Sequence, residues 1–263
     1  MTKSPTGPES TPPPRTSQRI EQHFFPEVGA GGSTRLDGTW QFYSRVSSLI
    51  DPSMTVLDLG AGRGAALEAA SGTWKAPIVI LQGRVKKLIG IDVDDAVLSN
   101  RFLDEAHVYD GGKLPLADGS IDMIVSDYTL EHIDDPAVFS AEIGRVLRPG
   151  GWLCGRTPNF FSLLTLAASI APNRSHVSLL KRIQPDRKEF DVFPTRYRLN
   201  TVRQLGKFFP ALAWENYSYT YSPEPGYHFN NKAIFRMLLL YQYIKAPLLG
   251  GEVLMVFLRK KNQ

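Results

Sequence analysis

The chain has 263 residues, of which 43% are hydrophobic and 21% are charged, with a formal net charge of +4. This length suits one large α/β domain with insertions, or a domain with a small cap, and the composition is that of a globular protein. Cys154 is the only cysteine. An internal disulfide and a cysteine-based zinc cluster are therefore excluded, and a reducing, cytoplasmic setting is expected.

The first segment differs in composition from the rest of the chain. Residues 1–19 contain prolines at 5, 8, 12, 13 and 14, mixed with serine and threonine. They lack the apolar run of a signal peptide or a membrane-spanning helix, so a disordered tail is expected. Residues 20–53 are expected to form an N-terminal lid, with a glycine-rich loop at 29–33 and a helix over about 40–50.

From residue 54 onward, apolar strand patterns alternate with helical ones. Strands are predicted at about 54–59, 87–92, 106–109, 121–127 and 152–155, and helices after 64, from 95 and over 136–147. The run 78–81 after Pro77 predicts an inserted loop or a short strand. This alternation predicts an α/β fold with a doubly wound, Rossmann-like, mostly parallel seven-stranded sheet, helices on both faces, and a ligand at the carboxyl ends of the strands.

The second half departs from simple alternation. Helices are predicted over 160–170, 201–209 and 231–245, and strands over 211–221 and 252–259. We therefore expect a domain over 54–263 that carries a substrate-side helical insertion at about 158–210.

The segment 56–64, Val-Leu-Asp-Leu-Gly-Ala-Gly-Arg-Gly, is the strongest functional signal. A buried strand ends near Asp58, and glycines at 60, 62 and 64 allow a tight turn that a ligand can approach before a helix begins. The same glycines, with Ala65, also satisfy the looser dinucleotide fingerprint, so they do not by themselves choose a cofactor. Asp58 argues against a dinucleotide, because a carboxylate there would lie beside the pyrophosphate.

The glycine turn resembles the first motif of the class I S-adenosylmethionine (AdoMet) dependent methyltransferases. Three further segments match that family in order: 89–93, 109–122 and 126–132. The likeness covers about 54–157 and is closest to the broad small-molecule (type 11-like) family, which includes ubiquinone-biosynthesis enzymes. It implies AdoMet as cofactor, held by Asp58, Gly60, Ala61, Gly62, Gly64, Asp92, Val93, Asp110, Gly111 and Ser126.

The resemblance also implies roles for the acidic residues. Asp58 attracts the ammonium group of the methionyl portion, whereas it would repel a phosphate. Asp92 accepts both ribose hydroxyls, a role that would serve NAD equally well. Asp110 faces the adenine amino group, and the Gly111 amide donates to a ring nitrogen.

Methyl transfer is an in-line displacement at a carbon that the sulfonium already activates, so the protein mainly aligns the reactants and removes a proton. His132 is the candidate general base, because its ordinary pKa suits neutral pH; bracing of its loop is the alternative role. No metal is expected, since the pair Asp134-Asp135 before Pro136 is typical of a helix start.

The acceptor is suggested by weaker signals. Residues 174–207 carry nine Lys/Arg against three acids, which favours a phosphate-tolerant pocket or, alternatively, a solvated face over a helical lid. A loose likeness to methyltransferases of bacterial glycan and secondary-metabolite pathways favours a small molecule or glycan precursor, methylated on oxygen. A nucleic-acid methyltransferase is the alternative, although the Asn/Asp-Pro-Pro segment of base methylation is absent after 121–127. A non-catalytic AdoMet-binding protein is the third interpretation.

One apolar segment suggests an interaction surface. Residues 234–244 are apolar and are flanked by Lys232 and Lys245. This pattern predicts peripheral membrane contact, packing on the sheet, or a homodimer interface.

Overall fold

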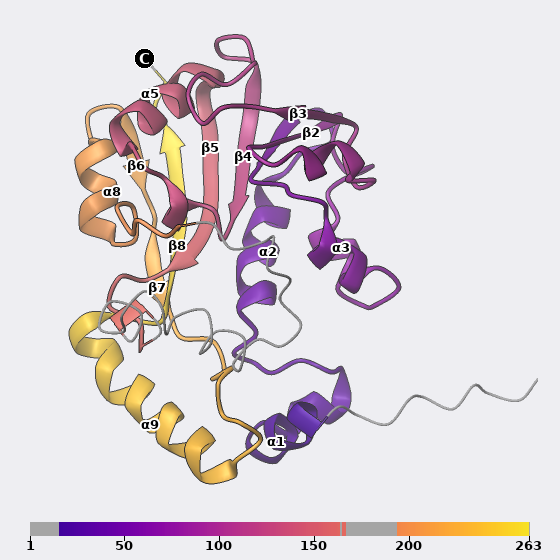
Figure 1. The fold of residues 1–263 in the computed structure, drawn as a ribbon, viewed down its shortest axis with the longest axis vertical. Coiled ribbons are helices and arrows are strands. Elements are labelled where there is room, and N and C mark those ends of the chain that lie inside the picture. The colour runs from indigo at the N-terminus through magenta and orange to yellow at the C-terminus, as the bar shows by residue number, and fades with distance from the viewer. Residues whose placement is uncertain (1–15, 164, 167–193, 263) are drawn as a thin grey trace, which may run out of the picture.

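A computed structural model describes residues 16–163, 165–166 and 194–262 (Figure 1). Its strands are β1 (Thr55–Leu59), β2 (Lys87–Asp92), β3 (Glu105–Val108), β4 (Ile121–Asp127), β5 (Leu147–Pro158), β6 (Trp214–Asn216), β7 (Tyr219–Tyr221) and β8 (Val253–Lys260). Its helices are α1 (Thr16–Phe24), η1 (Pro26–Ala30), α2 (Gly38–Leu49), α3 (Ala65–Ala70), α4 (Ala76–Val79), η2 (Asp95–Ser99), η3 (Leu130–His132), α5 (Pro136–Val146), α8 (Val202–Phe208) and α9 (Lys232–Leu249). Residues 1–15 of the tail predicted over 1–19 lie outside the described part, whereas residues 16–19 begin α1. Residues 174–193 of the predicted basic segment also lie outside the described part.

The strands form one mostly parallel sheet in the order β3-β2-β1-β4-β5-β8-β6, which confirms the predicted fold class. Strands β1 to β5 run parallel, and β8 is antiparallel to β5. The order of the strands reverses between β1 and β4, which are neighbours in the sheet. Ligands of such sheets bind beside the carboxyl ends of the strands at this reversal. Figure 1 shows the helices packed on both faces of the sheet.

The sheet has eight strands rather than the predicted seven, because the strand expected over 211–221 is broken. β6 pairs with the last residues of β8, whereas β7 pairs with its first residues. At the break, Tyr217 N–H donates to the Phe257 carbonyl, and Phe257 N–H donates to the Ser218 hydroxyl at 3.1 Å. A side-chain oxygen thus takes the place of a backbone carbonyl and interrupts the ladder. The two short strands share one edge position.

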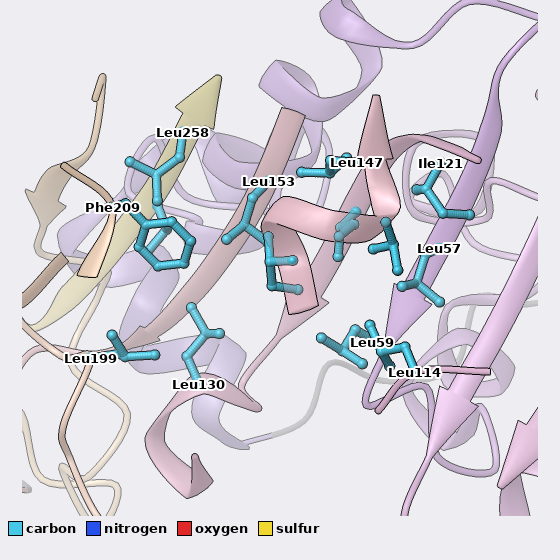
Figure 2. Close-up of a cluster of buried hydrophobic side chains, with 14 of the residues drawn as sticks. Leu57, Leu59, Leu114, Ile121, Leu130, Leu147, Leu153, Leu199, Phe209 and Leu258 are labelled. Carbon is cyan, nitrogen blue, oxygen red and sulfur yellow. The ribbon is translucent and has the colours of Figure 1, made fainter. Parts of the chain in front are cut away.

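Two hydrophobic clusters cover the two faces of the sheet. One cluster joins Leu57 and Leu59 of β1 to α5 and α8, and Figure 2 shows part of it. The other joins Val56 of β1 to α2 and α4. Since successive side chains of a strand point to opposite faces, Asp58 lies on the same face as Val56. Burial on both faces explains why the central strands read as continuous apolar runs.

The run after Pro77 is a short helix, α4, so the predicted loop or strand at 78–81 is wrong. Pro77 lies in the first turn of this helix, where its missing N–H breaks no hydrogen bond. Val79 is 6% exposed and belongs to the hydrophobic cluster that also contains residues of α2. Tertiary packing of this face outweighs the strand preference of the β-branched run.

The segment predicted to make an interaction surface lies in α9. Phe235 is fully buried and stacks on Phe24 of α1, with ring centroids 4.8 Å apart. Leu240, Tyr243 and Ile244 are exposed. Within the part of the chain that the structure describes, no helix is long and apolar enough to cross a membrane.

Candidate functional site

The glycine turn at the end of β1 has the backbone that its sequence predicts. Gly60, Gly62 and Gly64 all have positive φ, of 80°, 47° and 75°. A Cβ on Gly60 would lie 2.1 Å from the Thr129 hydroxyl, and one on Gly64 would lie 2.5 Å from the Asn100 side-chain oxygen. On Gly62 the nearest atom would be an Asp92 oxygen at 4.0 Å. The absence of a Cβ therefore lets Gly60 and Gly64 pack closely against Thr129 and Asn100. At Gly62 it leaves space beside Asp92.

Two contacts hold the turn in place. Gly60 N–H donates to the carbonyl of Ile91 at 2.8 Å, which ties the turn to the end of β2. The Asn100 amide donates to the carbonyls of Ala61 and Gly62, each at 3.1 Å. The backbone carbonyls of the turn thus have protein partners, and its open side faces Asp92.

Asp58 is the most perturbed acid of the site. Burial, together with the negative charges of Asp127 and Asp92, raises its pKa from 3.8 to about 7. Such a shift indicates that the described chain places no neutralising cation beside this carboxyl group. Asp58 lines a cavity of about 130 Å³ with Gly60, Ala61, Gly64 and other residues that include Asp127. A bound cation would remove the electrostatic cost of ionising Asp58.

Asp92 lies at the end of β2 and is 9% exposed. One of its carboxylate oxygens accepts the Gly62 N–H at 2.8 Å and the other accepts the Asp94 N–H at 3.0 Å. The carboxylate therefore points to the glycine turn, and its role toward the ribose hydroxyls stays a prediction. Val93, the next residue, is 47% exposed and leaves the sheet.

Asp110 and Gly111 lie in the exposed loop that follows β3. Tyr109 N–H donates to the Asp92 carbonyl at 3.0 Å, which brings this loop beside the end of β2. Asp110 accepts the Gly112 N–H at 2.9 Å, and a Cβ on Gly111 (φ 88°) would meet open space. Neither residue lines one of the two cavities described for the molecule.

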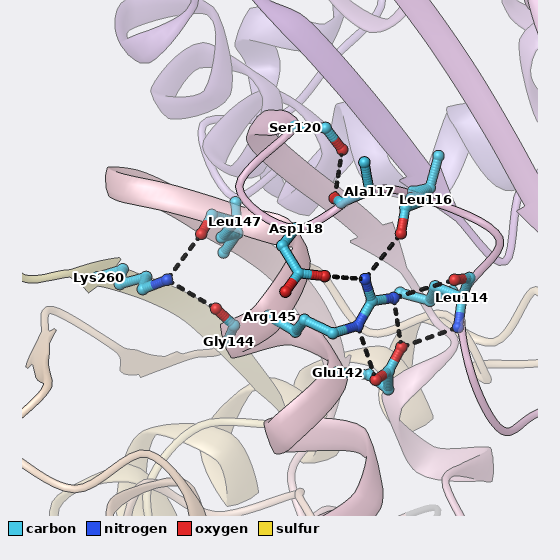
Figure 3. A network of polar contacts seen from close by, with 10 residues as sticks. All are labelled: Leu114, Leu116, Ala117, Asp118, Ser120, Glu142, Gly144, Arg145, Leu147 and Lys260. Carbon is cyan, nitrogen blue, oxygen red and sulfur yellow. Dashed lines mark hydrogen bonds and ion pairs between the residues drawn. The ribbon is translucent and has the colours of Figure 1, made fainter.

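Arg145 of α5 anchors the rest of this loop (Figure 3). Its guanidinium donates to the carbonyls of Leu114 and Leu116, to Asp118 and to both oxygens of Glu142. Glu142 also accepts the Leu114 N–H at 2.9 Å. The bond to Arg145 lowers the pKa of Glu142. The loop that follows β3 is thus held in place by a network of charge-assisted hydrogen bonds.

At the end of β4, adjacent residues point to opposite faces. Ser126, a predicted cofactor residue, is fully buried, and its hydroxyl has no hydrogen-bond partner in the described part of the chain. Asp127 instead shares the face of Asp58 and lines the same cavity. Sequence analysis missed Asp127; its place directly after an apolar strand, as for Asp92, was the available signal.

Asp127 forms the centre of a second polar group. Arg156 of β5 pairs with both of its carboxylate oxygens, and the Tyr43 hydroxyl donates to Asp127 at 3.2 Å. The Arg156 guanidinium also donates to the Thr39 hydroxyl and lies over the Tyr128 ring, 5.0 Å from its centroid. Burial raises the pKa of Tyr128 to about 12, so its hydroxyl keeps its proton at neutral pH. This group links α2 to the carboxyl ends of β4 and β5.

His132, the predicted general base, ends η3 shortly after β4. Its Nδ1 lies 3.0 Å from the Pro194 carbonyl oxygen. Glu131 beside it is buried, accepts the Thr157 hydroxyl at 2.8 Å, and has a pKa raised by burial. His132 lines neither described cavity. Its placement therefore matches the bracing role directly, and its role as a base remains a prediction.

The larger cavity has a volume of about 280 Å³ and adjoins the Asp127 group. Arg156 and Tyr128 form one wall, and α1, the start of α2, Lys75 and the segment 223–226 contribute the others. The smaller cavity contains Asp58 and Asp127, so the Arg156–Asp127 pair lies between the two. Of the basic residues predicted for an acceptor pocket, Arg196 and Arg198 instead pair with Asp134 at 3.1 and 3.6 Å.

Comparison with known proteins matches these observations. A family model described as "Methyltransferase domain" matches residues 57–155. A protein of a Streptomyces fradiae transposon is 41% identical over 119 residues, which are 43% of this chain and 32% of that protein. A Mycolicibacterium smegmatis protein named "Probable S-adenosylmethionine-dependent methyltransferase" is 33% identical over 109 residues, 40% of this chain and 38% of that protein. The chain thus spans only about a third of the length of these relatives.

Other similar proteins have specified reactions in their names. They include a ubiquinone/menaquinone C-methyltransferase of Laribacter hongkongensis and a ubiquinone O-methyltransferase of Thiobacillus denitrificans. Among solved structures, a SAM-dependent methyltransferase of Thermotoga maritima aligns with a TM-score of 0.50 at 15% identity, over 94% of this chain and 99% of that one. This last likeness supports the fold.

The site also fits the cofactor of these families. The unneutralised Asp58 suits the ammonium group of AdoMet, the Asp92 carboxylate suits a ribose, and Gly62 leaves room between them. Residues 57–155 therefore match the methyltransferase domain family, and S-adenosylmethionine is the cofactor that this family and its named relatives imply.

Proposed function

We propose that this protein transfers the methyl group of AdoMet to an oxygen of a small molecule or glycan precursor. The observation that carries the proposal is Asp58. Among the described residues no cation neutralises this acid, and it lines the same cavity as the glycine turn. A larger cavity for an acceptor adjoins it across the Arg156–Asp127 pair. The named relatives include one O-methyltransferase and one C-methyltransferase, so oxygen is the finer part of the proposal.

The residues of the three strand ends would hold the cofactor. Bound AdoMet supplies an activated methyl group on its sulfonium. Asp58 would pair with the ammonium group, and Asp92 would accept ribose hydroxyls beside its present bonds to Gly62 and Asp94. Asp110 and Gly111 would receive the adenine edge on the loop that Arg145 anchors. Gly60, Gly64, Ala61 and Val93 would shape the turn and its border, and Ser126 would support it from the opposite face.

A hydroxyl acceptor must lose a proton during transfer, and we propose His132 for this step. Because His132 does not line the larger cavity, the acceptor would have to extend beyond it toward η3. The Pro194 carbonyl can only accept a hydrogen bond, so the Nδ1 that contacts it carries the proton. The neutral ring then has Nε2 as its basic nitrogen. Peptide contacts at Arg196 and Tyr197, whose N–H groups donate to the Glu131 carbonyl, hold this segment against η3.

Isothermal calorimetry with AdoMet, S-adenosylhomocysteine and NAD tests the cofactor. We expect micromolar binding of the first two and none of NAD, and Asp92→Ala should weaken AdoMet binding at least tenfold. The matched control is Asp95→Asn, at an exposed acid of η2. Binding of NAD without AdoMet would refute the assignment.

Transfer of a labelled methyl group into cell extracts, separated into small molecules, glycan precursors and nucleic acids, tests the acceptor. We expect label in the first two fractions. Label confined to RNA or DNA, with salt-sensitive binding, would support a nucleic-acid methyltransferase. AdoMet binding without any transfer would support a non-catalytic AdoMet-binding protein. The cytoplasmic setting belongs to the same proposal and rests on the single, buried Cys154.

A further inference from the structure

The larger cavity is assembled from segments that are far apart in the sequence. Glu21 comes from α1, Asp37 to Thr39 from the start of α2, and Lys75 from the residue that caps α4. Glu224 comes from the segment between β7 and α9, and Val253 and Met255 come from β8. Its volume of about 280 Å³ is at the lower end for a small-molecule site. Its position beside the Asp127 group is where an acceptor would meet the cofactor.

Both basic side chains of this cavity are already neutralised by carboxylates. Lys75 Nζ lies 2.5 Å from an Asp37 oxygen. Arg156 pairs with both oxygens of Asp127. An anionic acceptor would therefore have to displace the carboxylate from one of these ion pairs. Displacement of Asp127 is disfavoured, because the Arg156 side chain is only 10% exposed. The cavity offers no unpaired cation among the described residues that line it.

Two further carboxylates of the cavity have no such partner. Glu21 and Glu224 form no ion pair within the described part of the chain. One carboxylate oxygen of Glu224 is buried and has no hydrogen-bond partner there. Burial is the main cause that raises the pKa of both residues, and the charge of Asp37 adds to the increase at each. The nearby Lys75 charge acts in the opposite direction at Glu21, and a hydrogen bond with Thr34 does so at Glu224. The two acids thus line the same cavity, and no ion pair among the described residues neutralises either of them.

We propose that this cavity binds the acceptor through a protonated amine held between Glu21 and Glu224, so that the methyl acceptor is a small, amine-bearing, hydroxylated molecule. The inference rests on the proposed function, and it narrows the acceptor class. A primary ammonium group has three N–H donors, which is enough for it to donate a hydrogen bond to each of the two carboxylates. The Tyr128 and Thr39 hydroxyls, which border the same space, suit hydroxyl groups of the acceptor.

The test uses pairs of probes that differ only in an amine. We would titrate glucosamine against glucose, galactosamine against galactose and serinol against glycerol, with glucose 6-phosphate as an anionic probe. Binding is measured by calorimetry on the full chain saturated with S-adenosylhomocysteine, and turnover is measured with AdoMet. The variants are Glu21→Gln, Glu224→Gln and the double variant. Glu215→Gln, at a half-buried acid of β6, is the matched control.

We expect at least one amine to bind tenfold or more tightly than its neutral counterpart. Each single variant should weaken that amine by roughly tenfold, the double variant by up to a hundredfold, and the control by less than twofold. AdoMet affinity should stay near that of the wild type and the melting temperature should be at least as high, which shows that the variants are folded. A preserved affinity of the amine in the double variant would refute the proposal.

The remaining outcomes also decide. If no amine binds better than its neutral partner, or if glucose 6-phosphate is the preferred probe, the cavity does not recognise an amine and the proposal is wrong. If the wild type binds AdoMet and methylates neutral probes as well as amines, only this inference fails. If the wild type does not bind AdoMet, the proposed function itself fails. The amine titrations then show only whether the cavity binds amines, and not that an amine is the methyl acceptor.

Discussion

Asp58→Asn should stabilise the cofactor-free protein and weaken its cofactor binding. The substitution keeps the shape of the side chain but removes a carboxylate that burial, Asp127 and Asp92 disfavour in its ionised form. A substitution that raises stability while lowering function is expected where a site stores electrostatic strain for its ligand. The Asp58 site is the clearest example in this molecule.

The size and the pH dependence follow from the raised pKa. A pKa that rises from 3.8 to about 7 corresponds to a cost of about 4 kcal/mol to the folded state once the group is ionised in both states. Below the lower value both states are protonated and the cost is absent. It grows between the two values as only the unfolded state ionises, and it is constant above about pH 7. Relaxation of the folded chain reduces it, so we expect a gain of about 2 kcal/mol or more.

The assay is thermal unfolding from about pH 5 to pH 8.5, with and without AdoMet. For a chain of this size, 2 kcal/mol corresponds to an increase in Tm of roughly 4–8 °C, to be seen near pH 8 and to shrink toward pH 5. Wild-type AdoMet affinity should rise with pH up to about 7, because the cation binds ionised Asp58, whereas the variant should be weaker and lack this dependence. Asp95→Asn, at an exposed position, is the control for the substitution itself.

Two results would refute the reasoning about Asp58. One is a Tm of Asp58→Asn below that of the wild type near pH 8, since an ionised, unneutralised acid cannot be stabilising. The other is an AdoMet affinity that is the same for both proteins at each pH. Either result would mean that the carboxyl group has a partner, or a pKa, other than the structure indicates.

Three further substitutions test other parts of the site. Gly60→Ala should destabilise the protein by about 2 kcal/mol or more in thermal unfolding, because its Cβ would lie 2.1 Å from the Thr129 hydroxyl at a φ of 80°; a neutral effect would contradict the tight turn. Arg145→Ala should weaken AdoMet severalfold in calorimetry by releasing the loop of Asp110, and unchanged affinity in a folded variant would show that the loop does not bind cofactor. His132→Gln should lower the rate of methyl transfer about a hundredfold without changing AdoMet affinity, and an unchanged rate would leave His132 only a bracing role.

The sequence by itself determined the fold class and most of the cofactor side of the site. Apolar runs separated by helical patterns predict the parallel strands, because period and turn residues are local properties. The positive φ values at Gly60, Gly62 and Gly64 follow from the same local logic. Thr201 and Asp135 cap their helices in the structure, as their sequence context predicts.

Only the tertiary structure decided which acids share one space. Ser126 and Asp127 are neighbours in sequence, but a strand turns them to opposite faces, so a shift of one residue changes which of them lies near Asp58. The Arg145 anchor, the Arg156–Asp127 pair and the cavity of Glu21 and Glu224 all join residues from distant segments. Pairing and burial of such groups depend on how the whole chain packs, and local sequence patterns contain no record of that packing.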